Sequence, residues 1–566
     1  MKKATPIFLS AALSLLCTGT VSAHDKTRPA FEAARNAARE KAQSVREKEN
    51  RSTCRLTIGL SDAKTKQPLF GLVRVTRIEE NEAWPLVDAL ERPMSWYALP
   101  ARSTVNIPRT KVKIEAIHGM ETDVTERVLD LTGKTEATVE LPLVRFYDPE
   151  ANGVRSGNTH VHLILEAHQK VSVYLRSRSE ADQYLQTTSK ADGLDLVYVS
   201  HLTRPGKTYI TNDYTDDDFK RLSEGVLFAN GEEYRHAGRN VDGKTSMSYG
   251  HVMFLDLTKL VLPVSLGPGL TPGGKATDNV PLRPGILEAR RDGAGVIWCH
   301  GTRGLEDVPS LVTGLLDAQN IYDGGNDGTC STVFYPYLNA GFRVPFSTGT
   351  DWGIYDFARV YVPLEGPVSS KGFLRALSAG KSYITNGTFL DFQVNDAKTG
   401  DTLALSKPGK VNVRGKAVGR EDFTRIELVH NGEVIHAADS KPVASHFEAE
   451  MDFSMDVDEP GWLALRIPTD RVYEARSQYS GKGTNILGKA LFAHTSPVYV
   501  ELGGRKMFEP AAAERLISDM ERSISMIQAK GIFDTAQERV RVLEIYREGI
   551  AVLRERLDEE SESQAR

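Results

Sequence analysis

The stretch LDLVYVSH, residues 194–201, is a mostly apolar run that ends in a histidine. Two further runs, GVIWC at 295–299 and RVPFST at 343–348, are continuous in the same way and are separated by helix-length segments. Apolar runs without alternation are typical of strands buried on both faces, as in sheets covered by helices. We therefore predict that residues 148–390 form a parallel α/β sheet or barrel.

The segments on both sides of this region follow a different pattern. Apolar and polar residues alternate from 53 to 147 and again from 391 to 504, as Val112, Ile114 and Ala116 do with the charged residues between them. A period of two predicts strands with one buried face. Each flanking segment is therefore expected to form a β-sandwich.

Two local signals refine the C-terminal part. Asn431-Gly432 lies between two strand-like runs and predicts a hairpin turn. In the tail, residues 505–566, the helical period restarts after Asp534 with Gln537 three positions later, which predicts a capping box and a second helix. The first helix places four apolar residues on one face: Leu516, Met520, Ile524 and Ile527. The tail is therefore interpreted as a helical hairpin.

The N-terminus has the features of a cleavable export signal. Lys2 and Lys3 precede an apolar run of about a dozen residues and a small-residue triplet that ends at Ala23. We expect cleavage near Ala23 and a periplasmic or extracellular protein, with a helical arm at 24–52. No other run approaches the roughly 18 apolar residues of a membrane span, so none is expected.

Composition narrows the classes of partner. The chain has 70 Lys and Arg against 75 Asp and Glu, a formal net charge of −5, and neither sign forms a long block. Nucleic acid is therefore not expected as a partner. Only Cys54, Cys299 and Cys330 follow the export signal, too few for a disulfide framework. Cys299 is interpreted as a core residue because it lies inside an apolar strand.

The first metal-binding signal is a pair of histidines in GNTHVHLILEAHQK, residues 157–170. His160 and His162 are two positions apart, so in a strand both imidazoles project to the same side and can meet one ion. A lone pair of this kind is more often ordinary than metal-linked. Its weight depends on where the other histidines and carboxylates fall.

Polar residues stand at the expected ends of the buried strands. His201 and His300 end two of the apolar runs, and Asp351 follows the third. In a (β/α) barrel the C-terminal ends of the strands converge on one face, so these side chains are expected to meet there. Glu233 and His251 add further ligands. Mixed histidine and carboxylate ligation suits Zn²⁺, Mn²⁺ or Fe²⁺.

The order of these residues resembles the PHP (polymerase and histidinol phosphatase) superfamily of metallohydrolases over residues 150–390. The exported branch with flanking β-domains, the CehA/McbA carbaryl-hydrolase-like family, is the most similar by motif, and LFAHTSPVYVE at 491–501 is also similar to that branch. The resemblance implies a distorted (β/α) barrel between an N-terminal and a C-terminal β-sandwich.

The resemblance also implies a ligand set for two divalent metal ions. The first ion would be held by His160, His162, Glu233 and Asp351. The second would be held by Glu233, His251 and His300, so that Glu233 bridges the pair. The expected activity is hydrolysis of a small-molecule ester or phosphoester, because two such cations activate water and polarise the bond.

Three positions depart from the family pattern. His168 and His201 match two ligands of a third ion, but the position of its last histidine is Gly353, so we expect two ions. Asn158 and Ser200 stand where the family usually has aspartate. These two changes leave open which residues orient the neighbouring metal ligands through hydrogen bonds.

The remaining site residues follow from their positions beside these motifs. With the third position vacant, His168 and His201 are candidate proton donors or substrate ligands. Arg235, Arg303 and Lys207 are candidates for contact with an anionic substrate, although each is equally well explained as a solvated loop charge. A different class of function is an exported binding or adhesion protein with a structural or decayed metal site. Oligomeric state is left open.

Overall fold

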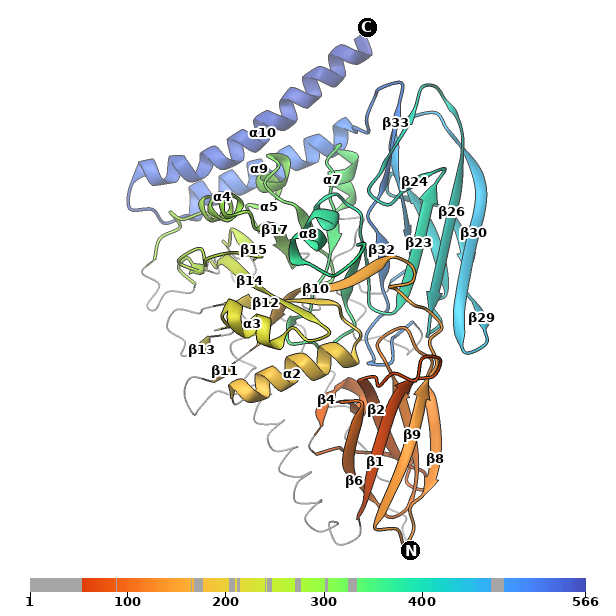
Figure 1. Ribbon diagram of the computed structural model, residues 1–566. Coiled ribbons are helices and arrows are strands. Elements are labelled where there is room, and N and C mark those ends of the chain that lie inside the picture. The colour runs from red at the N-terminus through yellow and green to blue at the C-terminus, as the bar shows by residue number, and fades with distance from the viewer. Residues whose placement is uncertain are drawn as a thin grey trace, which may run out of the picture.

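The structure is a computed structural model of the chain that describes twelve segments. These are residues 53–87, 89–163, 165–166, 177–202, 209–210, 214–239, 241, 247–269, 276–300, 304–323, 333–469 and 483–565. The expected export signal and helical arm lie outside them. The described part is mixed α/β and rich in strands, with eight α-helices (Figure 1). Among the described helices, none has both the length and the apolar character needed to cross a membrane.

The N-terminal part folds into two sheets around one hydrophobic core. One sheet has the order β6-β1-β9, and the other has the order β4-β5-β2-β7-β8 with β3 paired to β2. The strands are β1 (Thr53–Asp62), β2 (Gly71–Arg77), β3 (Glu82–Trp84), β4 (Leu90–Arg92), β5 (Trp96–Leu99), β6 (Arg102–Pro108), β7 (Lys111–Ile117), β8 (Thr125–Asp130) and β9 (Glu136–Leu143).

The predicted alternation is confirmed most clearly in β9. Val139, Leu141 and Leu143 are buried, and the residues between them are exposed or half-buried. In β7 the pattern is interrupted because Glu115 is buried as well. Its carboxylate accepts a hydrogen bond from Arg74 Nε at 2.8 Å, which compensates the buried charge.

The central part contains short strands and six helices. The strands are β10 (Val154–His162), β11 (Leu165–Glu166), β12 (Leu196–His201), β13 (Tyr209–Ile210), β14 (Leu227–His236), β15 (Gly250–Leu255), β16 (Ser265–Leu266), β17 (Gly295–Cys299), β18 (Ala318–Asn320), β19 (Phe346–Ser347), β20 (Asp351–Trp352), β21 (Arg359–Pro363) and β22 (Tyr383–Thr385). The helices are α2 (Arg178–Ala191), α3 (Asp216–Leu222), α4 (Arg283–Asp292), α5 (Asp307–Val312), α7 (Tyr335–Asn339) and α8 (Ser370–Ser378).

The central sheet is curled and mixed rather than parallel throughout. β10, β12 and β14 are parallel neighbours, and β17, β18 and β19 form a second parallel group. Between the two groups, β15 runs antiparallel to both β14 and β17. On its other side β10 pairs with β20 in parallel and with β21 antiparallel. The expectation of a parallel sheet is therefore correct for the two groups and wrong at β15 and β21.

The C-terminal strands continue from the central sheet. β22 pairs with β21 on one side and with β32 on the other, so hydrogen bonds join the two parts. A separate sheet has the order β24-β23-β26-β30-β29. The strands are β23 (Thr388–Val394), β24 (Ala397–Lys398), β25 (Thr402–Leu405), β26 (Gly409–Gly419), β27 (Arg425–His430), β28 (Glu433–Asp439), β29 (Lys441–Val443), β30 (His446–Val457), β31 (Gly461–Arg466), β32 (Ala493–Thr495) and β33 (Val498–Leu502).

The hairpin predicted at Asn431-Gly432 is confirmed. These two residues connect β27 to β28, which pair antiparallel. Their φ angles are 51° and 99°, both in the left-handed region that a two-residue hairpin turn requires. Asparagine and glycine are the residues that adopt this conformation most readily.

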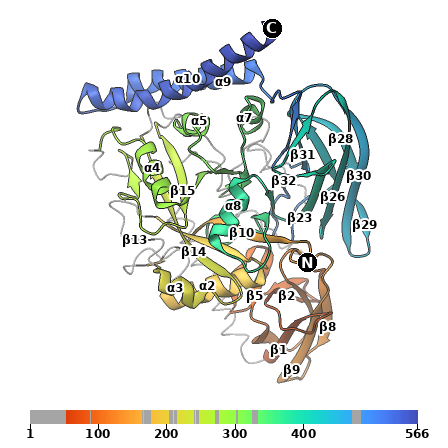
Figure 2. The same ribbon diagram turned by 45° about the horizontal axis from the view of Figure 1, so that its top comes forward.

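The tail forms the expected pair of helices, α9 (Pro510–Lys530) and α10 (Ala536–Ala565), which lie side by side at one end of the molecule (Figure 2). Leu516, Met520 and Ile527 are buried, which confirms the apolar face. The capping box lies one residue later than predicted. Thr535 Oγ accepts from the Glu538 amide at 3.2 Å, and the Glu538 carboxylate accepts from the Thr535 amide at 3.1 Å.

A buried ion pair joins the N-terminal part to the central part. Arg92, the last residue of β4, donates two hydrogen bonds to Asp192 at the end of α2, at 2.8 and 2.9 Å. The two side chains are 1% and 0% exposed. The bidentate geometry is favourable, but it stabilises the protein only while both partners are present.

Arg92→Ala is expected to destabilise the protein strongly, because it leaves the Asp192 carboxylate buried without its main partner. We expect the free energy of unfolding to fall by about 3–5 kcal/mol in urea denaturation. Arg102→Ala is the matched control, since the Arg102–Glu140 pair is 64% and 61% exposed and its loss is expected to have a small effect. Equal losses in the two variants would contradict the role of this ion pair.

Candidate metal centre

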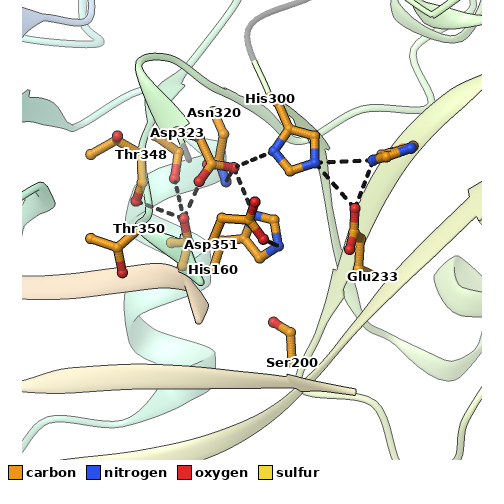
Figure 3. Close-up of polar contacts among 12 residues, drawn as sticks. His160, Ser200, Glu233, His300, Asn320, Asp323, Thr348, Thr350 and Asp351 are labelled. Atoms are coloured by element: carbon orange, nitrogen blue, oxygen red, sulfur yellow. Dashed lines mark hydrogen bonds and ion pairs between the residues drawn. The ribbon is translucent and has the colours of Figure 1, made fainter. Parts of the chain in front are cut away.

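The six residues expected to bind metal lie in five strands of the central sheet or directly after one, and Figure 3 shows four of them close together: His160, Glu233, His300 and Asp351. His162 is the last residue of β10 and His160 lies two residues before it, Glu233 lies in the second half of β14, and Asp351 begins β20. His300 directly follows β17, and His251 is the second residue of β15. The structure therefore brings together residues that are up to 191 positions apart, from His160 to Asp351.

His251 reaches this edge because β15 is antiparallel. In register, His251 stands opposite Arg235 near the end of β14 and opposite Cys299 at the end of β17. The beginning of an antiparallel strand lies beside the ends of its neighbours. A residue at a strand start thus joins residues at strand ends.

The first group consists of His160, His162, Glu233 and Asp351, whose potential ligand atoms lie within 4.8 Å of one another. His162 Nε2 is 2.9 Å from Glu233 Oε2 and also 2.9 Å from His160 Nε2. Asp351 Oδ1 is 3.5 Å from the Nε2 atoms of both histidines. All four residues are buried.

The second group consists of Glu233, His251 and His300. Glu233 Oε1 is 2.7 Å from His251 Nδ1 and 3.1 Å from His300 Nε2, and those two nitrogens are 3.0 Å apart. Glu233 therefore points one oxygen at each group. Its position is that of a carboxylate able to bridge two ions.

The hydrogen-bond partners of His160 and His162 determine which ring nitrogens carry protons. His160 Nδ1 is 2.7 Å from Asp323 Oδ2, and His162 Nδ1 is 2.9 Å from the Ser200 carbonyl oxygen. Because both partners are acceptors, both Nδ1 atoms must donate. In the neutral rings, each Nε2 then presents a lone pair to the other and to carboxylate oxygens. Without a shared proton or cation these contacts are repulsive, so the donor set fits a divalent cation.

The charges of the centre lead to the same conclusion. Burial raises the pKa of Glu233, but the neighbouring histidines outweigh it and hold the pKa well below its usual value. Burial opposes charge on Asp323 too, and His160 and His300 keep its pKa below the usual value. Burial disfavours a charged His300, yet Glu233, Asp351 and Asp323 raise its pKa to about 9. Ionised carboxylates thus lie against histidines whose charge they stabilise, and the same groups are able to bind a cation in place of those protons.

The loop that carries Asp351 is fixed against β10. Thr350 N donates to the His160 carbonyl at 3.0 Å, and Gly353 N donates to the His162 carbonyl at 2.9 Å. A Cβ at Gly349 would lie 2.5 Å from His160 Cβ, so only glycine allows this approach. Asp351 has a φ of 58°, a left-handed conformation that aspartate tolerates better than most residues.

The C-terminal strands support the same loop. Ser496, which follows β32, accepts a hydrogen bond from the amide of Phe346 in β19 at 2.9 Å. His494 donates from Nδ1 to the Thr495 carbonyl at 2.7 Å, so its Nε2 accepts from the Tyr335 hydroxyl at 2.7 Å. Burial lowers the pKa of His494 to about 3, which keeps the ring neutral for this contact. The segment 491–501 thus acts as a structural support for β19 and the loop after it.

Asn158 and Ser200, which stand where aspartates were expected from the resemblance, both have structural roles. Asn158 donates from Nδ2 to Thr350 Oγ at 2.8 Å, and its Oδ1 accepts from the His160 amide at 3.2 Å. Ser200 contributes its backbone carbonyl to His162, as described above. An aspartate is therefore not needed at either position to orient these two histidines.

Asp323 contacts the candidate metal centre, and sequence reasoning missed it. It follows β18, is fully buried, and contacts His160 from behind. The rule that placed His201 and His300 at strand ends applies to it as well. However, β18 has only three residues, and the following GGNDG reads as a loop.

Cys299 is a buried core residue, as the sequence predicts. It is 2% exposed, and its sulfur lies near His160, His300 and Asp323. Burial raises the pKa of its thiol well above the usual value, and the nearby carboxylates act in the same direction. The thiolate that a metal requires is therefore disfavoured in the metal-free protein.

The described residues do not bring together a set of ligands for a third metal ion. His201 ends β12 and is half-buried, whereas His168 lies outside the described segments. Gly353 has a φ of 70°, and a Cβ there would lie 3.0 Å from Tyr184 Oη. A histidine at position 353 would therefore be strained and crowded.

Of the candidate substrate contacts, only Arg235 is described. It lies two residues after Glu233 on β14, so both side chains are on the same face of the strand. Arg235 is 6% exposed, and its Nε donates to Ser265 Oγ at 3.3 Å. Lys207 and Arg303 lie outside the described residues.

Comparison with known proteins identifies no relative of this chain, so a function can be argued only from the geometry of the site. No protein-family model matches the chain, and neither a curated protein nor a solved structure matches it.

Proposed function

We propose that this chain is an exported metal-dependent hydrolase that cleaves an ester or phosphoester bond of a small molecule with two divalent cations. The observation that supports this most strongly is the Glu233 carboxylate. One of its oxygens contacts His162, and the other contacts His251 and His300. A buried carboxylate shared by two sets of histidines is the arrangement that a two-metal site requires.

The residues present fit two cations of this kind. His160, His162, Glu233 and Asp351 would hold the first, and Glu233, His251 and His300 would hold the second. Imidazole and carboxylate ligands suit Zn²⁺, Mn²⁺ or Fe²⁺. When bound, such a pair supplies a water nucleophile near neutral pH and polarises a carbonyl or phosphoryl oxygen.

The chain's own residues supply orientation and proton transfer. Arg235 follows Glu233 on the same strand face and is proposed to bind an anionic oxygen of the substrate. His201, at the end of β12 beside β14, is proposed to contact the substrate or donate a proton to the leaving group. His168, Lys207 and Arg303 keep the roles expected from the sequence.

The fold proposed with this function is a PHP-type distorted (β/α) barrel at 148–390 between two β-sandwiches at 53–147 and 391–504. The curled central sheet and the two N-terminal sheets around a shared core support it. The proposal of export rests on the basic and apolar N-terminus with cleavage near Ala23.

The purified protein is expected to contain two divalent metal ions per chain and to hydrolyse p-nitrophenyl acetate or bis-p-nitrophenyl phosphate. Chelation should abolish turnover, and added Zn²⁺ or Mn²⁺ should restore it. Glu233→Gln removes the charge shared by both groups, so we expect loss of bound metal and a fall in kcat/KM of at least about a hundredfold.

His446→Ala is the matched control, because His446 also contacts a carboxylate, Glu448 at 3.2 Å, but lies in the separate C-terminal sheet. It should keep both ions and full turnover. Stoichiometric metal without turnover on a broad ester panel would reject the hydrolase and favour a binding or adhesion protein. Absence of stoichiometric metal would reject the metal centre itself.

Arg235→Ala is expected to discriminate between substrates. A hydrogen bond to a charged group contributes about 1.5–3 kcal/mol, so kcat/KM for bis-p-nitrophenyl phosphate should fall by about 10–100-fold. Hydrolysis of the neutral p-nitrophenyl acetate serves as the internal control and should change much less. Equal losses on both substrates would show that Arg235 acts on the metal centre or on stability rather than on an anion.

A further inference from the structure

Asp323 occupies a position behind two histidines that belong to different groups. Its Oδ2 is 2.7 Å from His160 Nδ1 and 3.7 Å from His300 Nδ1. Figure 3 shows His300 between Asp323 and Glu233, with contacts at both of its ring nitrogens. The same carboxylate oxygen thus faces the outer side of one ligand from each group.

The inner nitrogens of these two rings face the proposed ions. His160 Nε2 points to His162 and Asp351, and His300 Nε2 points to Glu233 and His251. A carboxylate that accepts the Nδ1 proton leaves the lone pair on Nε2 and makes that nitrogen a better ligand. Asp323 accepts such a hydrogen bond from His160, whereas at 3.7 Å it acts on His300 only through its charge, because His300 Nδ1 has no hydrogen-bond partner among the described residues.

Asp323 is itself held in place by a buried network. Asn320 Nδ2 donates to Asp323 Oδ2 at 3.1 Å, and Asn320 Oδ1 accepts from Thr159 Oγ at 3.0 Å. The same hydroxyl lies 2.9 Å from the Thr348 carbonyl oxygen, so its single proton is shared between the two acceptors. These residues are fully buried, and Thr159 directly precedes His160. The network fixes the carboxylate relative to β10 and to the loop that leads to Asp351.

We propose that Asp323 is a shared positioning residue, whose single carboxylate orients His160 and His300 and so couples the two metal positions. The inference rests on the proposed metal centre and adds a residue that the ligand pattern of the sequence did not include. The shorter contact predicts a larger effect on the first position, and the 3.7 Å contact predicts a smaller effect on the second.

The test is Zn²⁺ binding to the full chain, measured by competition with a chromophoric chelator and by metal analysis. Asp323→Asn should weaken the Zn²⁺ affinity of both positions, and that of the first position, which includes His160, by about 10–100-fold. The absorption spectrum of the Co²⁺-loaded protein should shift, because the ligand strength of His160 and His300 changes. Asp323→Glu retains the charge and should lose less affinity than Asp323→Asn.

Asp307→Asn is the matched structural control. Asp307 is also buried, and it accepts hydrogen bonds from Gln319 at 2.9 Å and Tyr337 at 2.8 Å. Both variants are expected to lower the melting temperature of the metal-free protein, but only Asp323→Asn should lower Zn²⁺ affinity. A loss of stability in Asp323→Asn with both affinities unchanged would overturn the proposal.

Two further outcomes separate this inference from the proposed function. If Asp323→Asn loses one ion completely and leaves the affinity of the other unchanged, Asp323 is a direct ligand and the proposal is wrong. Cys299→Ala should bind both ions normally. If it loses an ion, a cation lies on the outer side among Cys299, His160, His300 and Asp323, which also overturns it. A wild-type protein that binds no Zn²⁺ would reject the metal centre as a whole.

Discussion

Two imidazole nitrogens that both present lone pairs cannot remain 2.9 Å apart without a positive charge to share. His160 and His162 are held in this arrangement because their outer nitrogens are committed to Asp323 and to the Ser200 carbonyl. The inner nitrogens and the carboxylates of Glu233 and Asp351 then converge on one small volume. The rest of the central sheet serves to maintain this convergence.

The strands that carry these residues are short, so the sheet alone does not fix them. β20 has two residues and β19 has two, and their loop is secured by backbone hydrogen bonds to β10 and by Ser496 from the C-terminal strands. The continuous pairing of β21, β22 and β32 joins the two parts. The C-terminal strands are therefore part of the support of the centre, rather than an independent attachment.

The sequence was sufficient where one residue type or one period determines the structure. The period of two predicted the buried face of β9, and Asn431-Gly432 predicted the turn between β27 and β28, because few residues adopt left-handed φ angles. The strand-end rule placed His300 and Asp351 at one edge. It could not show that β15 is antiparallel, because strand direction depends on pairing with β14 and β17 and leaves no local pattern.

The same limit explains why Asp323 was missed and why it matters. A ligand can be recognised by its spacing, but a residue that acts on a ligand from behind is defined only by a contact across 163 positions of sequence. In a metal-free binding protein, ionised carboxylates buried at Glu233 and Asp323 would each cost several kcal/mol of desolvation. The histidines offset that cost and hold the pKa values of Glu233 and Asp323 below their usual values, but they do so as charged rings, and burial opposes charge on His251. Bound cations would supply the positive charge without protonated histidines, which is consistent with a metal centre.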